Sequence, residues 1–290
     1  MKRKVTADQR RRREITWFWV MRVLTYAVVA FVGVVLLDII VKGAPRLDWA
    51  FLTQETGPHH TTGGIFPAIV GTFYLVVGSI GIALPVGVCA AVYLSEYAKN
   101  TWFTRLIRIC IVNLAGVPSI VFGLFGSAAF VVYFEFGRSL LAGWLTLALM
   151  ILPVVITTSE EALRAVPNGF REGSLAVGAT KWQSIRTNVL PYALPGMLTG
   201  SILSVARVAG ETAPIMFTVG AFYTGGLPRS IFSQVQALPY YLYTVSVNVT
   251  NSKAALPTAY GAALVLIVMV FGMNLLAMVL RAKLRKKYRW

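Results

Sequence analysis

Charged residues are scarce in this sequence of 290 residues. They make up 13% of the chain, whereas hydrophobic residues make up 57% and the mean hydropathy is +0.68. A soluble domain of this size is typically about half apolar and about a quarter charged. The shortage of charge therefore excludes an ordinary soluble enzyme or binding domain, and it predicts an all-α polytopic membrane protein.

Acidic residues are the rarer of the two charged kinds, with 11 Asp and Glu against 27 Lys and Arg. Such an excess of positive charge can indicate a nucleic-acid partner, but here the basic residues lie in the short segments between apolar runs. That distribution is typical of membrane topology signals rather than of a binding stripe. We therefore expect a lipid membrane and no nucleic acid as partner.

Metal-binding and catalytic patterns are also missing. The two cysteines, Cys89 and Cys110, lie inside apolar runs without metal-ligand or disulfide spacing, so we expect them to be small packing residues. His59 and His60 form a lone pair, and we expect a surface position rather than a metal site. No GxxxxGK[ST] phosphate loop occurs, so the chain should not hydrolyse ATP and should bind no cofactor itself.

The apolar residues are grouped into six segments, each near the roughly 20 residues that cross a hydrocarbon core. They are expected near residues 16–41, 65–94, 106–134, 140–159, 192–223 and 258–281. This layout predicts a basic arm (1–15), a six-helix membrane domain (16–281) and a basic tail (282–290). The arm leads into a segment long enough to span, so we expect a signal anchor rather than a cleaved leader.

The basic residues orient these spans. With the N-terminus inside, 20 of the 27 Lys and Arg residues lie in inside segments and 5 in outside loops. Arg22 and Arg207 fall within spans. Because inside loops of membrane proteins are enriched in Lys and Arg, the count predicts that both termini are cytoplasmic.

Glycine and proline interrupt the second and third spans, most clearly at Pro85 and Pro118. The freed backbone groups need neighbouring protein or a water-lined cavity, so these spans either are kinked packing helices or line a pathway. In the outside segment 224–257, Pro228 and the apolar residues up to Leu238 suggest a short interfacial helix. The tyrosines that follow suit an aromatic belt. The Asn-Val-Thr triplet at 248–250 matches a glycosylation sequon, although such short matches are common by chance.

The fifth span carries charge inside the membrane. Arg207 and Glu211 are four residues apart, so they can pair on one helix face. The same helical stripe carries small and polar residues, namely Gly200, Ser204, Pro214 and Thr218. Such a pair either fixes helix packing or lines a substrate pathway, and intramembrane charge favours the pathway. An arginine suits an oxyanion because its planar fork donates two parallel hydrogen bonds.

We therefore predict a substrate pathway formed by Arg207, Glu211, Thr212 and Ser204. Arg207 would contact the anion, and Glu211 would partly neutralise Arg207 so that the anion is attracted without being trapped. Pro214 cannot donate to the carbonyl of Gly210, which leaves an acceptor on the same side.

Between the fourth and fifth spans lies the polar segment 160–191. Its apolar residues recur at roughly helical spacing. Pro167 and Gly178 divide it into short helices, and Leu190-Pro191 is expected to close it before the next span. The segment is either a solvated loop with interfacial helices or a docking surface for a partner.

Four stretches resemble the membrane-spanning subunits of ATP-binding-cassette importers, most closely the A-type permeases of phosphate importers. They run through nearly all of the chain: GTFYLVVGSIGIALPVGVCAAVYLSEYA, NLAGVPSIVFGLFG, EEALRAVPNGFREGSLAVGATKWQSI and RVAGETAPIMFTVGAF. The importer motif of the central loop is matched at Glu172, Gly178, Leu190 and Pro191. Gly173 and Ser174 replace its two alanines, and Asn188 replaces its isoleucine.

The resemblance implies a type I importer fold of the MetI-like kind. It also implies a partner ATPase that receives the loop at Asn168, Arg171, Glu172, Gly173, Ser174 and Gly178. The remaining implied partners are a homologous C-type permease, a second ATPase subunit and an external phosphate-binding protein. ATP and Mg²⁺ would bind at the ATPase subunits.

The expected function is therefore that of a permease subunit that passes inorganic phosphate through the plasma membrane. Sulfate or molybdate stay open as cargo, because one arginine and a few hydroxyls suit any tetrahedral oxyanion. A self-sufficient secondary transporter is a further alternative, although no internal inverted repeat is evident.

Overall fold

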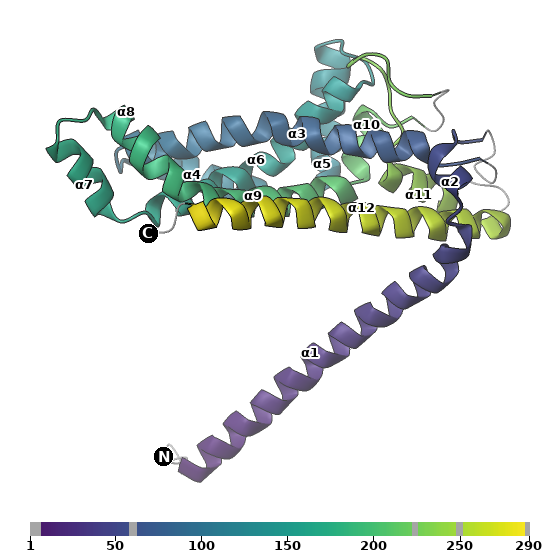
Figure 1. Ribbon diagram of the computed structural model, residues 1–290, viewed down its shortest axis with the longest axis horizontal. Coiled ribbons are helices and arrows are strands. Elements are labelled where there is room, and N and C mark those ends of the chain that lie inside the picture. The colour runs from purple at the N-terminus through teal and green to yellow at the C-terminus, as the bar shows by residue number, and fades with distance from the viewer. Residues whose placement is uncertain (1–6, 58–62, 222–225, 248–251, 288–290) are drawn as a thin grey trace.

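The computed structural model describes residues 7–57, 63–221, 226–247 and 252–287, and within them every regular element is helical (Figure 1). The long helices are α1 (Ala7–Gly43), α3 (Phe66–Val92), α6 (Leu140–Arg164), α9 (Leu190–Gly210) and α12 (Ser252–Lys287). The shorter ones are α2 (Trp49–Thr53), α4 (Trp102–Ala115), α5 (Ser119–Gly126), α7 (Asn168–Ala176), α8 (Lys181–Ser184), α10 (Ala213–Thr218) and α11 (Leu238–Val247). One 3₁₀ turn, η1 (Ala44–Arg46), and three π-helical turns, η2 (Tyr93–Tyr97), η3 (Ser127–Tyr133) and η4 (Ile185–Val189), join them.

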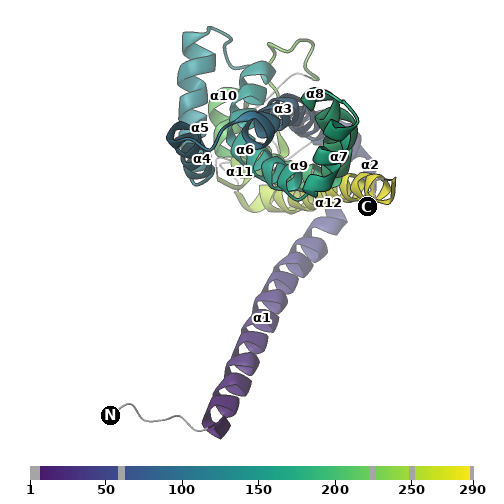
Figure 2. The ribbon, with the colours of Figure 1, turned by 90° about the vertical axis from the view of Figure 1, so that its left-hand side faces the viewer.

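Helices α3, α6, α9 and α12 lie roughly side by side and form the body of the molecule (Figures 1 and 2). Its main core includes Leu147 and Ile151 of α6 with Val208 of α9, all fully or nearly buried. Glycines bring these helices close together. A Cβ atom on Gly200 of α9 would lie 1.9 Å from the Oγ1 atom of Thr158 on α6, so no other residue fits there.

Gly78 and Gly87 of the second span serve the same close packing against α6. A Cβ on Gly87 of α3 would lie 2.6 Å from the Cγ1 atom of Val155 on α6. Pro85 lies inside α3, and the helix continues past it to Val92. The second span is therefore one uninterrupted helix packed closely on α6 in this chain.

Helix α1 projects away from this body (Figures 1 and 2). Its apolar side chains are exposed on all sides, as expected for a helix that contacts lipid or another chain. It meets the body at its C-terminal end. There the Nζ atom of Lys42 lies 2.7 Å from Asp38 Oδ1 and 3.4 Å from the Tyr260 hydroxyl of α12.

Five described helices are long and apolar enough to span a membrane, and the pair α4 and α5 would make a sixth. The interruption predicted at Pro118 in the third span is a full change of direction, because α4 and α5 meet at an angle of 102°. The bend lies at residues 116–118. Pro118 adopts an extended conformation there and precedes the first residue of α5, which a continuing helix would not allow.

The fifth span also differs from its prediction. Leu190-Pro191 does not close the preceding segment, because α8, η4 and α9 follow one another without a break. The π turn η4 lies just before Pro191 and widens the helix there. Pro191 has no N–H, so it could not donate the hydrogen bond that an ordinary α-helical turn requires. The break comes later. Helix α9 ends at Gly210 and α10 begins at Ala213. The predicted polar stripe of the fifth span, from Gly200 to Thr218, is therefore divided between two helices.

The expected interfacial helix from Pro228 to Leu238 is absent from the described residues of that segment. Its backbone instead pairs with the body: the Val235 amide donates to the Val219 carbonyl, and the Ser233 carbonyl accepts from the Leu140 amide. Because these groups are used in pairing, they cannot form helical turns. The helix of this region, α11, begins only at Leu238.

The solvent exposure of individual side chains corrects two smaller predictions, for the cysteines and for the tyrosines near residue 240. Cys89 and Cys110 are both exposed rather than packed, because they lie on outward faces of α3 and α4. Tyr241 is 3% exposed in a second core that includes Phe51 of α2, so it does not belong to an aromatic belt; Tyr243 remains exposed. The histidine pair 59–60 and the sequon at 248–250 lie outside the described residues.

Apart from the basic N-terminal arm, the segments predicted to face the cytoplasm come together in space. The α3–α4 turn, the helices α7 and α8 and the C-terminal part of α12 all lie at one end of the body (Figure 1). We call this end the α7 end. Which side of the membrane it faces stays a prediction from the positive-inside count.

Candidate functional site

Helix α7 is a short, sharply bounded unit. Pro167 precedes its first residue in an extended conformation, and Gly178 follows its end with φ +86°. The Gly178 amide donates to the Leu175 carbonyl at 3.0 Å, and the Ala179 amide donates to the Ser174 carbonyl at 3.1 Å. These two bonds form a Schellman motif, which requires a left-handed residue at the position of Gly178. The predicted division at Pro167 and Gly178 is thus confirmed.

One face of α7 is held against the body. Phe170 packs on the ring of Tyr192 with ring centroids 4.8 Å apart. Ser174 is 8% exposed, and its hydroxyl bonds to the Ser184 hydroxyl of α8. Arg171 lies on this inward face as well, so two residues predicted to meet an ATPase are placed in the contact of α7 with its own chain.

Arg171 uses four of its five N–H donors in hydrogen bonds within the chain. Its Nη2 atom lies 2.7 Å from Glu96 Oε1, and its Nε atom contacts both oxygens of the same carboxylate. Two further donors reach the backbone carbonyls of Val166 and Leu163 at 2.7 and 2.8 Å. The side chains of Arg171 and Glu96 are 20% and 7% exposed. This bidentate pair fastens α7 to η2, at the end of α3.

The opposite face of α7 is free in this chain. Asn168, Glu172 and Gly173 are exposed there, as is Gly178 beyond the helix. Large apolar side chains accompany them, since Leu175, Val177 and Trp182 are 49%, 85% and 54% exposed. Exposed apolar groups rimmed by polar residues are typical of a docking surface. The structure therefore favours docking over a plain solvated loop for residues 168–182.

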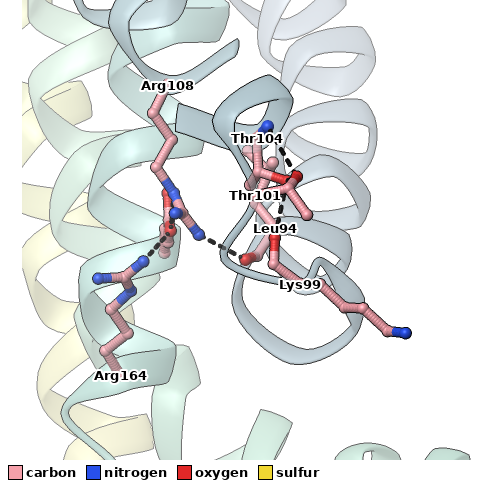
Figure 3. A network of polar contacts seen from close by, with 7 residues as sticks. Leu94, Lys99, Thr101, Thr104, Arg108 and Arg164 are labelled. Carbon is pink, nitrogen blue, oxygen red and sulfur yellow. Dashed lines mark hydrogen bonds and ion pairs between the residues drawn. The ribbon is translucent and has the colours of Figure 1, made fainter. Parts of the chain in front are cut away.

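Sequence reasoning missed a second polar network at the α7 end (Figure 3). Glu160 of α6 has an 11% exposed side chain, and its Oε1 atom accepts from Arg108 Nε of α4 at 2.9 Å. It also accepts from Arg164 at 2.6 Å. The Nη2 atom of Arg108 donates to the Leu94 carbonyl of η2 at 2.8 Å. The available signal was an acidic residue at the end of an apolar run, where a buried carboxylate needs a basic partner.

The break in the fifth span holds the predicted substrate residues. Arg207 lies in the last turn of α9, and Glu211 follows that helix in an extended conformation. The Nε atom of Arg207 and the Oε1 atom of Glu211 are 3.7 Å apart, which is an ion pair without a close hydrogen bond. Their side chains are 34% and 16% exposed. The guanidinium is thus partly accessible, and its contact with Glu211 is loose.

The other two predicted substrate residues differ from each other. Thr212 lies within the break, is half-buried, and precedes α10. Ser204 is 2% exposed, and its hydroxyl donates to the Gly200 carbonyl at 2.9 Å. Gly200 is the residue that packs on Thr158 of α6. The structure therefore places Thr212 within the break, next to Glu211 in the chain, and places Ser204 among buried residues of α9.

No group of three or more histidine, cysteine or acidic residues that could hold a metal ion occurs in the part of the chain that the structure describes.

Residues 83–290 match the family described as binding-protein-dependent transport system inner membrane component. The chain belongs to this family. The matched residues include α7, the pairs Arg171–Glu96 and Arg207–Glu211, and the break in the fifth span.

Three relatives show how far the similarity extends. The chain is 33% identical over 264 residues to the probable ABC transporter permease protein YqgI of Bacillus subtilis, covering 86% of this chain and 88% of the relative. It is 39% identical over 233 residues to the phosphate transport system permease protein PstA of Mycobacterium leprae, covering 79% and 75%. The PstA of Yersinia pestis is 33% identical over 285 residues, covering 97% and 94%.

Two solved structures share the fold. The inward-facing MetNI methionine ABC transporter aligns with a TM-score of 0.59 at 20% identity, over 76% of this chain and 94% of that chain. A bacterial ABC transporter that imports alginate aligns with a TM-score of 0.63 at 12% identity, over 93% and 98%. The permease is thus a polytopic inner-membrane protein with the fold of MetI-type importer subunits.

Proposed function

We propose that this permease passes inorganic phosphate across the plasma membrane as the A-type subunit of an ATP-driven importer, with both termini in the cytoplasm. The observation that carries the proposal is the similarity, over most of the chain, to several permeases named for phosphate transport. The partly exposed, loosely paired guanidinium of Arg207 at a helix break supports it, because such a group has donors left for an oxyanion.

The break gives Arg207 and Glu211 distinct roles. Arg207 binds the phosphate through its planar fork, and Thr212 contributes a hydroxyl beside it. Glu211 lowers the net positive charge of the site, so that the anion leaves again when the subunit changes state. The pathway itself forms between this chain and a homologous C-type permease, with a phosphate-binding protein outside and two ATPase subunits inside.

The exposed face of α7 is the surface that meets an ATPase subunit. Asn168, Glu172 and Gly173 supply polar contacts, and Leu175 and Val177 supply apolar area. Arg171 and Ser174 hold the helix to the body from the other side, so force on α7 passes into the bundle. ATP and Mg²⁺ bind at the ATPase subunits, and this chain takes part in no chemical step.

The experiment that tests this proposal is uptake of radiolabelled phosphate by the whole transporter in proteoliposomes. We expect uptake that requires internal ATP and the binding protein and that resists competition by sulfate or molybdate. Full competition by sulfate would assign another oxyanion as cargo. Phosphate flux through this chain alone, without ATPase subunits, would instead indicate a self-sufficient carrier.

A further inference from the structure

Three cationic side chains converge on the π turn η2 at the end of α3. Arg171 of α7 holds Glu96 through a bidentate pair, and Arg108 of α4 donates to the Leu94 carbonyl. Lys181 of α8 lies over the ring of Tyr97, with its Nζ atom 4.9 Å from the ring centroid. The turn thus receives contacts from the helices α7, α8 and α4.

The path from η2 to α4 is stiff (Figure 3). Thr101 caps α4 by accepting from the Thr104 amide, and the Thr104 hydroxyl donates to the Lys99 carbonyl at 2.9 Å. The Thr101 amide donates to the Lys99 carbonyl at 2.8 Å. With Arg108 bound to the Leu94 carbonyl one turn further along α4, a displacement of η2 displaces α4 with it.

Arg108 is also the link from α4 to α6. Its Nε atom donates to Glu160, whose side chain is 11% exposed, while its Nη2 atom holds Leu94. The two acceptors are served by two different nitrogens of the rigid guanidinium, whereas a lysine would have to reach both from its single nitrogen. Arg108 therefore joins α3, α4 and α6 at one guanidinium.

The far end of α4 leads to the break in the fifth span. After the 102° bend, α5 packs directly on α10 at Gly123. A Cβ atom on Gly123 would lie 2.9 Å from Phe217 Cδ2 and 3.0 Å from the Cα atom of Pro214. Because no side chain separates the two backbones, α10 cannot stay in place when α5 moves.

We propose that Glu96 and Arg108 are positioning residues of one mechanical relay. The relay runs from α7 through η2 and α4 to α5 and α10, and it carries the motion of the docking helix to the break beside Arg207 and Glu211. It rests on the proposed function only in requiring that an ATPase moves α7. Neither residue contacts the cargo. Their substitution therefore changes how the break responds to nucleotide, and leaves the cargo site itself intact.

The test measures the break directly and needs no phosphate. Met216 of α10, which is half-buried, is replaced by cysteine in a chain whose exposed Cys89 and Cys110 are changed to serine. The assembled transporter is labelled with a water-soluble thiol reagent, with and without a non-hydrolysable ATP analogue. In the parent complex, we expect nucleotide to change the labelling rate at least about threefold, as a shift between two states requires.

The variants Glu96→Gln and Arg108→Lys should bring this ratio close to one. Glu96→Gln keeps the shape and removes the charge, and Arg108→Lys keeps the charge but cannot bridge Leu94 and Glu160. Both complexes should still assemble and hydrolyse ATP, which a merely misfolded variant would not do. Matched controls are Glu161→Gln and Arg105→Lys, since these exposed neighbours lie outside the relay.

A nucleotide response that persists in both relay variants would overturn the proposal, as would the absence of any response in the parent complex. A response lost equally in the two control variants would also count against it. Failure of phosphate uptake with the labelling pattern intact would bear on the cargo alone, so the two proposals fail separately.

Discussion

Two arginine–glutamate pairs, one at the α7 end and one at the break in the fifth span, differ in how the same residue types are paired. Arg171 and Glu96 at the α7 end are 2.7 Å apart, with side chains 20% and 7% exposed. Arg207 and Glu211 at the break are 3.7 Å apart, with side chains 34% and 16% exposed. The first guanidinium also donates to two backbone carbonyls, so four of its five donors are in use.

The difference lies in what each arginine can still bind. A guanidinium has five donors. Arg171 uses four of them within the chain, and the buried carboxylate of Glu96 would be left uncompensated if Arg171 were removed. Arg207 makes a loose contact with one carboxylate and keeps donors for a ligand. A nearly saturated pair holds structure, whereas an unsaturated pair at a helix break is suited to transient binding of an anion.

The largest expected effect tests the unsaturated pair. Arg207→Ala should lower phosphate uptake by about 100-fold, because two charge-assisted hydrogen bonds of about 1.5 kcal/mol each are lost. Uptake by the assembled transporter in proteoliposomes measures this. The matched control is Arg22→Ala on α1, whose guanidinium lies 4.6 Å from the ring centroid of Phe18 and far from the break in sequence. Full uptake by the Arg207 variant would remove this residue from the pathway.

The second effect concerns the α7 end. Gly178→Val forces a β-branched residue to φ +86°, at a cost of about 1–3 kcal/mol that the chain can relieve by moving the end of α7. We expect phosphate transported per ATP hydrolysed to fall about tenfold, with ATP hydrolysis retained. Gly272→Val, at an open position with ordinary backbone on α12 and outside the proposed docking surface, is the control. Normal coupling in the Gly178 variant would contradict the docking role of this segment.

The third effect separates the two pairs by stability. Arg171→Ala leaves the buried carboxylate of Glu96 unpaired and should cost about 3 kcal/mol. In a protein of this size, that cost lowers the unfolding midpoint by about 6–10 °C. Arg207→Ala should leave the midpoint nearly unchanged, since Glu211 reaches solvent more easily. Thermal unfolding of the purified complex in detergent gives the midpoints of both variants. Equal shifts of the two midpoints would contradict the distinction between the two pairs.

The smallest effect sharpens the border of the substrate site. Ser204→Ala should change phosphate uptake by less than about twofold, because its hydroxyl is bonded within its own helix. Thr212→Ala, within the break, should reduce uptake by more than Ser204→Ala does. Uptake assays at several phosphate concentrations make this comparison. A larger effect at Ser204 than at Thr212 would return Ser204 to the pathway.

The sequence predicted the class of protein, because apolar runs of spanning length and basic connecting segments are local properties. It also predicted the bounds of α7, since the ring of Pro167 and the left-handed conformation of Gly178 depend on single residues. An interruption was predicted at Pro118, but neither the 102° size of the bend between α4 and α5 nor the break at 211–212 was. Proline and glycine signal a possible interruption, but packing against neighbours decides between a kink and a full change of direction.

The faces of the helices likewise needed the fold. Helical spacing placed Arg207, Glu211 and Ser204 on one stripe, but it could not say that Gly200 packs on α6 and Ser204 is buried while Arg207 stays accessible. The sequence around Arg171 showed a charged residue in a segment proposed for docking. It did not show that Glu96, a buried carboxylate 75 residues away in the chain, accepts hydrogen bonds from Arg171.

By itself, therefore, the sequence determined which segments span, where the short docking helix begins and ends, and which charges lie within the membrane. The tertiary structure alone decided which arginine is nearly saturated and which is left with free donors. The physical reason is that a hydrogen-bond partner distant in sequence leaves no periodic signal, whereas span length, proline and glycine act on the chain locally.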